Sequence, residues 1–88
     1  MRERFDEIRR EITANDEEIV AAVNRRIDLV AALWRLKAEL GYDTVDPDRE
    51  RLLREHLATT SSGPLSPEGL DRLVSALLEL TKRELGAS

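Results

Sequence analysis

The first half of the chain reads RERFDEIRREITANDEEIVAAVNRRIDLVAALWRLKAEL from Arg2 to Leu40. This stretch contains neither proline nor glycine, and its apolar residues recur at the three- and four-residue spacing of a helix face. It therefore predicts one uninterrupted helix of roughly 39 residues and about 58 Å. Gly41 follows directly, and because glycine commonly ends a helix, we expect the helix to stop there.

The second half predicts two shorter helices, each introduced by a capping residue and a proline. Asp46-Pro47 and Ser66-Pro67 both place a side-chain acceptor before a proline at the first helical position. We expect helices from about Pro47 to Leu57 and from about Pro67 to Leu85, with a polar loop from Thr59 to Pro64 between them. The predicted fold class is therefore all-α, with one long helix and two shorter ones.

The composition describes a single small soluble domain over residues 1–88. Apolar residues make up 41% of the chain and charged residues 36%, which is typical of a helical protein that stays in water. The absence of cysteine excludes disulfides, thiolate metal sites and cysteine nucleophiles. A single histidine, His56, offers a zinc site little to build on, so we expect no metal.

Charge and aromatic content argue against a nucleic-acid partner. The net charge is -4 with one Trp, one Tyr and one Phe, whereas a nucleic-acid surface needs a basic stripe and stacking rings. No apolar run is long enough to cross a bilayer, and charges from the second residue onward leave no apolar signal region. We therefore expect no membrane partner and a cytoplasmic location.

The lengths of the helices predict a homodimer. The two shorter helices would span about 17 Å and 28 Å, too little to cover the long helix from end to end. The long helix is nevertheless apolar along one broad face, made of Phe5, Ile8, Ile12, Ile19, Val23, Val30, Leu33 and Leu40. Because a bare apolar face of that length would favour aggregation, we expect a second copy to pack on it in an intertwined homodimer.

The same face carries charges. At steps of 3.5 residues it includes Arg9, Asp16, Arg26 and Lys37. A charge on a buried face costs several kcal/mol unless it is paired. In one interpretation the basic side chains reach out to solvent and Asp16 accepts a salt bridge from a neighbouring helix. In the other, Arg26 and Lys37, about 16 Å apart along the axis, hold a small anion from its two ends.

Further charges stand at the start of the second expected helix, where Arg49 and Glu50 follow the cap. Alone, they are typical surface charges of a helix. Together with the basic residues of the long helix, they would complete a site that recognises carboxylates and a hydroxyl group.

Several patterns occur in register along the chain. They are Ile8-Arg9-x-x-Ile12-x-x-x-Asp16, Arg25-Arg26, Leu36-Lys37 and Asp46-Pro47-Asp48-Arg49-Glu50. In a three-helix chain of this length they resemble the all-helical (AroQ-type) chorismate mutase family, and the resemblance covers essentially the whole chain. It implies an enzyme of the shikimate pathway and aromatic amino acid biosynthesis that converts chorismate to prephenate as an intertwined homodimer. Each active site would be built mainly from one subunit, plus an arginine from the other.

The resemblance also implies which residues bind and rearrange the substrate. Arg9 would be the arginine from the partner subunit, and with Arg26 and Arg49 it would grip the two carboxylates of chorismate. Lys37 would donate to the ether oxygen and to a carboxylate, facing the negative charge that develops as the C–O bond breaks.

The remaining implied contacts concern the ring. The backbone at Asp46 and the side chain of Glu50 would hold the ring hydroxyl, and Thr81 would stand where the family often has serine. Apolar walls would come from Val30, Leu33 and Leu78. The rearrangement is pericyclic and needs no nucleophile, metal or cofactor, so none is expected.

The third helix departs from the family pattern. Four residues after Thr81 the family commonly has Gln or Glu at the ether oxygen, whereas this chain has Leu85, with Glu84 one residue early. A one-residue step turns a helical side chain by about 100°, so Glu84 is not expected to substitute. Lys82 stands where a small apolar wall is usual. The ending resembles a subclass of poorly active mutases stimulated by a DAHP synthase, which makes such a synthase an expected partner.

Two other functions stay open. The altered third helix is compatible with a sister activity on the same scaffold, either a 4-amino-4-deoxychorismate mutase or an isochorismate pyruvate-lyase. In the alternative from a different class, the chain is a non-catalytic helical dimer and interaction module, whose inner charges only set register and partner choice.

Overall fold

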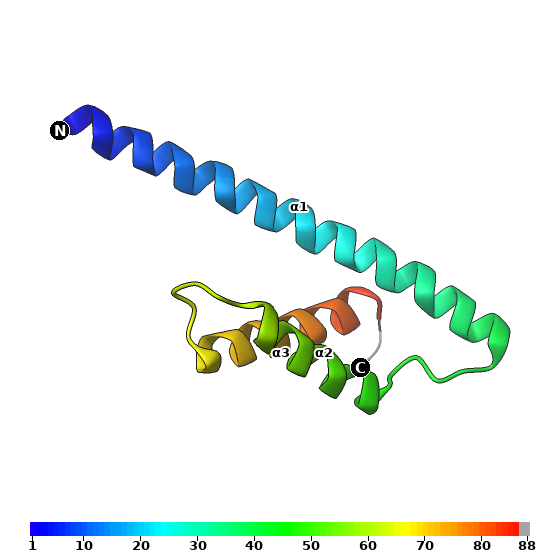
Figure 1. Ribbon diagram of the computed structural model, residues 1–88. Helices are drawn as coiled ribbons and strands as arrows, with labels where there is room; N and C mark the ends of the chain where they lie inside the picture. The colour runs from blue at the N-terminus through cyan, green and yellow to red at the C-terminus, as the bar shows by residue number, and fades with distance from the viewer. Residues whose placement is uncertain (87–88) are drawn as a thin grey trace.

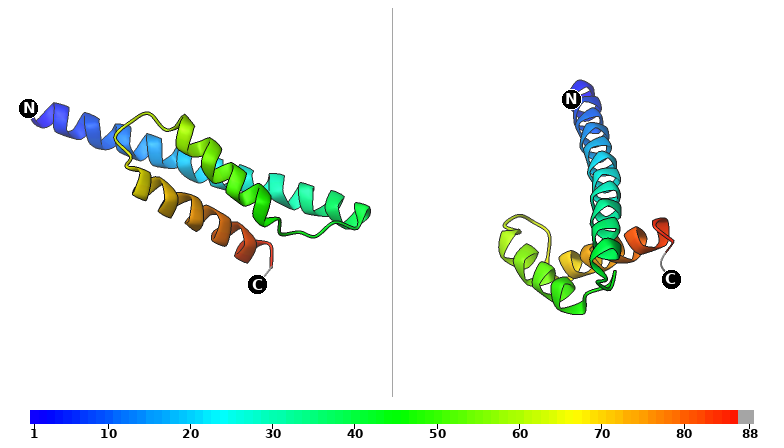
Figure 2. Two further views of the ribbon diagram at one scale, coloured as in Figure 1. Left: turned by 60° about the horizontal axis from the view of Figure 1, so that its bottom comes forward. Right: turned by 90° about the vertical axis from the view of Figure 1, so that its right-hand side faces the viewer.

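The computed structural model describes residues 1–86, which form three α-helices and no strand. The helices are α1 (Arg2–Leu40), α2 (Pro47–Thr60) and α3 (Pro67–Glu84). α3 packs against both α1 and α2, and the two shorter helices lie along one side of α1 (Figures 1 and 2). The all-α prediction of one long and two shorter helices is confirmed, whereas the pairing with a second copy stays a prediction.

The long helix has the bounds that its sequence predicts. It runs without interruption from Arg2 to Leu40, and Gly41 ends it in the left-handed conformation at φ 74°. In that conformation the amide of Tyr42 donates to the carbonyl of Lys37 at 2.8 Å, so a carbonyl of the last turn is satisfied. The chain then turns back toward the helix it has just left.

Both shorter helices begin at the predicted caps. Asp46 Oδ1 accepts from the amide of Arg49 at 3.2 Å, and Ser66 Oγ accepts from the amide of Gly69 at 3.0 Å. Each cap is followed by a proline at the first helical position, where the missing N–H costs nothing. The starts of α2 and α3 are therefore set by local sequence.

The predicted end of α2 was wrong. The helix continues beyond Leu57 to Thr60, so Thr59 and Thr60 belong to its last turn and not to the loop. Their hydroxyls donate back to the carbonyl of His56 at 2.7 Å and 3.0 Å, which holds these polar residues in helical geometry. α3 ends at Glu84 with Leu85 as its cap, one residue before the predicted end.

The core of the single chain is very small. Within residues 1–86 only Val74 and Thr81, both on α3, are buried, at 2% and 3% exposure. A polar clamp adds to this core, because Arg54 of α2 donates to Asp71 Oδ1 at 2.8 Å and to Ser75 Oγ at 2.9 Å on α3. So little burial is marginal for a stable fold.

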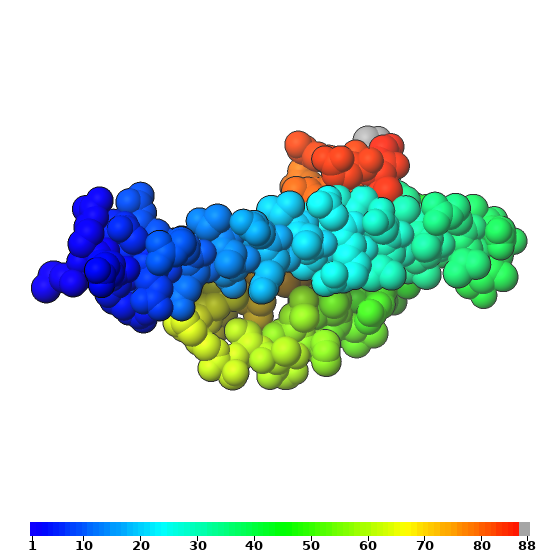
Figure 3. Space-filling view, turned by 90° about the horizontal axis from the view of Figure 1, so that it is seen from above, coloured from blue at the N-terminus to red at the C-terminus, as the bar shows by residue number. Residues whose placement is uncertain are grey.

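The first turns of α1 project beyond the other helices (Figure 3). Every residue from 7 to 22 is exposed. Four exposed large apolar side chains share one face of the N-terminal half of α1, and we call them the N-terminal stripe: Phe5, Ile8, Ile12 and Ile19, exposed by 52%, 41%, 55% and 53%. No helix within residues 1–86 combines the length and apolarity needed to cross a membrane.

Candidate functional site

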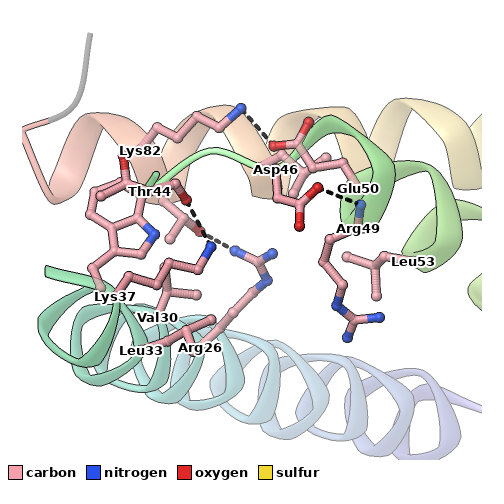
Figure 4. A pocket seen from close by; sticks show the side chains of 13 residues that line it. Arg26, Val30, Leu33, Lys37, Thr44, Asp46, Arg49, Glu50, Leu53 and Lys82 are labelled. Carbon is pink, nitrogen blue, oxygen red and sulfur yellow. Dashed lines mark hydrogen bonds and ion pairs between the residues drawn. The ribbon is translucent and has the colours of Figure 1, made fainter. Parts of the chain in front are cut away.

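A pocket of about 290 Å³ lies where the C-terminal half of α1 faces the start of α2 and the end of α3. Most of the residues singled out from the sequence line it (Figure 4). They are Arg26, Val30, Leu33 and Lys37 of α1, Asp46, Arg49 and Glu50 around the start of α2, and Leu78 and Thr81 of α3. Three elements far apart in the sequence thus contribute to one concave surface.

Arg26 is held in place by α3. One of its terminal nitrogens donates to the hydroxyl oxygen of Thr81 and, at 3.5 Å, to the carbonyl of Leu77. The Thr81 hydroxyl in turn donates to that carbonyl at 2.6 Å. Because a guanidinium carries five N–H donors, Arg26 keeps donor capacity for a ligand while its orientation is set by a buried threonine.

Lys37 lies three turns further along the same face of α1. Its ammonium donates to the backbone carbonyl of Thr44 at 3.1 Å, in the connection that returns from Gly41 to α2. In Figure 4 the amino group of Lys37 and the guanidinium of Arg26 point into the same space. An ammonium has three donors, so the bond to Thr44 aims Lys37 without using it up.

The start of α2 supplies a third cation. The carboxylate of Asp46 caps the helix at the amide of Arg49, and the side chain of Arg49 extends toward α1 (Figure 4). Within residues 1–86 its guanidinium forms no ion pair. The positive end of the α2 dipole adds to the favourable potential for an anion here.

The opposite side of the pocket holds an ion pair. Glu50 Oε1 of α2 lies 2.7 Å from Lys82 Nζ of α3, and the two side chains are 27% and 31% exposed. This pair links the two helices across the rim. The residue spacing had not pointed to it, since partners on different helices leave no periodic signal in a single sequence.

Three lining residues were missed as site residues: Trp34, Thr44 and Leu53. Helical spacing contained a signal for two of them. Trp34 is one turn after Val30, and Leu53 is one turn after Arg49, so each shares a face with a residue of the site. Thr44 lies in an irregular connection, where no periodicity exists to place it.

The end of α3 presents no carboxylate or carboxamide to the pocket. Leu85 caps the helix and is half-buried, and it is not among the lining residues. Glu84 lies with Glu79 and Arg83 around a separate surface hollow. The side chain of Glu84 thus faces away from the pocket, as a rotation of about 100° from Leu85 predicts.

Arg9 is the one predicted site residue that lies outside the pocket. It precedes Arg26 by 17 residues on a continuous helix, which is about 26 Å along the axis. Its guanidinium carbon lies 5.1 Å from the centre of the Phe5 ring, and no residue of α2 or α3 lines the shallow hollow around it. A single chain therefore cannot bring Arg9 to the other cations.

The chemistry of the pocket is that of an anion site with apolar walls. Arg26, Lys37 and Arg49 suit carboxylates, and Glu50 offers a carboxylate to a hydroxyl donor. Within the part of the chain that the structure describes, no three His, Cys, Asp or Glu side chains gather to hold a metal ion.

Comparison with known families identifies the chain. The family model for chorismate mutase type II matches residues 8–84, which spans all three helices and every residue of the pocket. The chain therefore belongs to this family. Neither a curated protein nor a solved structure matches it.

Proposed function

We propose that this member of the chorismate mutase type II family binds chorismate in the pocket and rearranges it to prephenate. The observation that carries the proposal is the convergence of Arg26, Lys37 and Arg49 on one space with apolar walls. Chorismate bears two carboxylates, and three cations around an apolar wall match such a dianion. A surface of solvated charges would show no such convergence.

The rearrangement asks the protein for conformational restraint and electrostatic stabilisation. The flexible enolpyruvyl group must be held over the ring, which the arginines and the walls of Val30, Leu33 and Leu78 would do. Lys37 would face the ether oxygen, where negative charge develops as the C–O bond breaks. Its bond to the Thr44 carbonyl fixes the ammonium before the substrate arrives, so little reorganisation is needed.

The polar rim would bind the ring hydroxyl. The backbone at Asp46 and the carboxylate of Glu50 stand at the start of α2, on the far side of the pocket from α1. Thr81 would act through Arg26, whose guanidinium it orients.

A second copy of the chain would complete the site. The N-terminal stripe is exposed in the single chain, and Arg9 stands beside it on the same helix. If two copies exchange these halves, the stripe of each is covered and the Arg9 of each reaches the other's pocket. Burial of four large side chains per copy would also supplement a core that is too small by itself.

Arg26→Ala tests the proposal, with Arg25→Ala as its matched control. Arg25 is the neighbouring arginine, exposed and absent from the pocket. We expect Arg26→Ala to lower kcat/KM for chorismate by about 10²- to 10³-fold, as loss of a preorganised donor does. Arg25→Ala should stay within about threefold of the parent. The decay of chorismate's ultraviolet absorbance measures both.

The same assay separates the competing functions. If the chain is instead a non-catalytic interaction module, Arg26→Ala and Lys37→Ala should leave its function unchanged. Parallel assays with 4-amino-4-deoxychorismate and isochorismate test the sister activities. Faster turnover of either compound than of chorismate would contradict our choice of substrate.

We further infer that the isolated protein is a modest mutase whose rate a DAHP synthase raises. Neither Leu85 nor Glu84 lines the pocket, so the end of α3 offers no carboxylate or carboxamide to the ether oxygen. A partner that rearranges this end would improve the site. Turnover measured across chorismate concentrations should rise when the synthase is added, and equal rates with and without it would contradict the inference.

A further inference from the structure

We propose that Lys82 is a specificity-determining residue of this pocket, which together with Glu50 admits a ring hydroxyl and rejects a ring ammonium group. The proposal rests on the proposed function, because it concerns the ring end of the same substrate site. The ion pair of Lys82 with Glu50 would favour chorismate over its 4-amino-4-deoxy analogue because Lys82 offsets the negative charge of Glu50.

The pair belongs to the pocket and not to the open surface. Both Lys82 and Glu50 line it, and their side chains retain less than a third of their exposure. The ion pairs between neighbouring turns of one helix are more exposed, by 44% or more at each partner, and Arg83 and Glu79 are 77% and 66% exposed. Screening by water is therefore weaker around Lys82 than around those pairs.

Glu50 is the carboxylate of the pocket that stands beside Lys82. The pocket has two acidic side chains, and the other, Asp46, caps the amide of Arg49 at the start of α2. Glu50 meets Lys82 through Oε1, so its second oxygen is available to a donor from a ligand. Lys82 has three N–H donors, and its contact with Glu50 leaves donors for a ligand.

A hydroxyl group satisfies both partners at once. It donates its proton to Glu50 and accepts from the ammonium of Lys82 through its lone pairs. The ion pair thus offers a donor and an acceptor side by side, which complements an alcohol. Neither partner is left unsatisfied when the substrate covers the pocket.

An amino substituent meets the opposite situation. A primary amine on a saturated carbon is protonated near neutral pH, so it can donate but not accept. It would offer Lys82 no acceptor and place two positive charges next to one carboxylate. Without Lys82, the uncompensated Glu50 would be a favourable site for that ammonium group.

A purely structural role for Lys82 makes a different prediction. If the pair only holds α2 to α3, loss of Lys82 weakens the fold or lowers the turnover of both substrates by the same factor. The ratio of the two kcat/KM values would then stay constant. That ratio is the readout that distinguishes the two roles.

The test compares Lys82→Met, Lys82→Arg and the control Arg83→Met on chorismate and 4-amino-4-deoxychorismate. Met keeps the length of the side chain without its charge, and Arg83 is the neighbouring cation on the exposed face of α3. We expect Lys82→Met to reduce the preference for chorismate at least about tenfold, chiefly through faster turnover of the amino compound. Lys82→Arg and Arg83→Met should keep the parent preference, and an unchanged ratio in Lys82→Met overturns the proposal.

A binding measurement separates failure of this proposal from failure of the proposed function. The chain has one tryptophan, Trp34, which lines the pocket, so its fluorescence reports occupancy without turnover. If the parent turns over neither compound but binds chorismate more tightly, and Lys82→Met loses that preference, the mutase assignment fails while the role of Lys82 stands. If Lys82→Met shows the parent's binding preference, the role of Lys82 fails whatever the turnover.

Glu50→Gln provides a second variant that does not depend on Lys82→Met folding well. Gln still accepts from a hydroxyl, but Lys82 then carries an uncompensated charge. The preference for chorismate in Trp34 fluorescence titrations should rise, and a fall would overturn the proposal. Thermal unfolding of each variant, followed by circular dichroism, checks that the protein is folded under the conditions of the titration.

Discussion

The two halves of α1 have the same apolar periodicity but very different surroundings. In the C-terminal half, α3 covers the inner face, and residues such as Val23, Ile27 and Val30 are half-buried. In the N-terminal half no residue from 7 to 22 is covered. Equal patterning with unequal packing fits the proposed dimer, in which one half of the helix packs within its own chain and the other half would pack on a second copy.

The charged residues show the same contrast. Arg26 and Arg9 belong to one continuous helix, yet Arg26 is oriented by Thr81 whereas Arg9 lies over the ring of Phe5. A cation–π contact at an exposed position contributes only about 0.5–1 kcal/mol, so it does not hold Arg9 firmly. Arg26 is preorganised within the chain, and Arg9 is available to be repositioned by a second copy.

The largest effect is expected from a charge placed in the N-terminal stripe. Ile12→Glu adds a charge to a side chain that is already 55% exposed, so the isolated chain should tolerate it. If the stripe is a dimer interface, the variant should sediment as a monomer and lose about 10³-fold or more in kcat/KM, because each pocket loses both its Arg9 and the packing of the second copy.

Ala14→Glu is the matched control for Ile12→Glu. Ala14 is exposed and lies about 200° around the helix from Ile12, on the opposite face. It should keep both the dimer and the turnover. A dimeric, active Ile12→Glu protein would show that the stripe has no part in assembly.

A smaller effect is expected when Arg9 alone is removed. Arg9→Ala should keep the dimer and lower kcat/KM for chorismate by about 10²-fold, whereas Arg10→Ala should change it little. Mixing Arg9→Ala with Arg26→Ala subunits should restore roughly a quarter of the parent turnover, because half of the dimers are hybrids with one intact site. Absence of this recovery after subunit exchange would place Arg9 outside the shared site.

The smallest effect is expected when Thr81, the residue that orients Arg26, is changed. Thr81→Val keeps the shape of the side chain but removes the acceptor of the Arg26 guanidinium and a donor to the Leu77 carbonyl. We expect about a tenfold loss in kcat/KM and a loss of about 1–2 kcal/mol in the free energy of unfolding. Chemical denaturation and the absorbance assay measure the two, and unchanged turnover would show that Arg26 needs no such support.

Much of this molecule follows from local sequence. The absence of proline and glycine predicts α1, Gly41 predicts its end, and the two caps predict the starts of α2 and α3. These features depend on residues within one or two turns, so a single sequence contains them. The end of α2 was missed because Thr59 and Thr60 are polar residues typical of loops, and their bonds to His56 are a detail of side-chain geometry.

In the site, too, some features follow from local sequence and others depend on contacts between helices. The charges on the inner face of α1 were visible from spacing, since Arg26 and Lys37 share one face of one helix. The Glu50–Lys82 pair was not visible, because it joins residues of two helices whose relative rotation no local rule determines. The orientation of Arg26 by Thr81 depends in the same way on how α3 rests against α1.

Local sequence specifies the helices, their caps and the faces on which the charges lie, because these depend on backbone sterics and on a period of 3.6 residues. The tertiary structure then selects which charges meet. It brought Arg26, Lys37 and Arg49 around one pocket, paired Glu50 with Lys82 across its rim, and left Arg9 on an uncovered half-helix. The physical reason is that contacts between helices depend on packing over long stretches of sequence, where small differences in crossing and rotation decide which side chains touch.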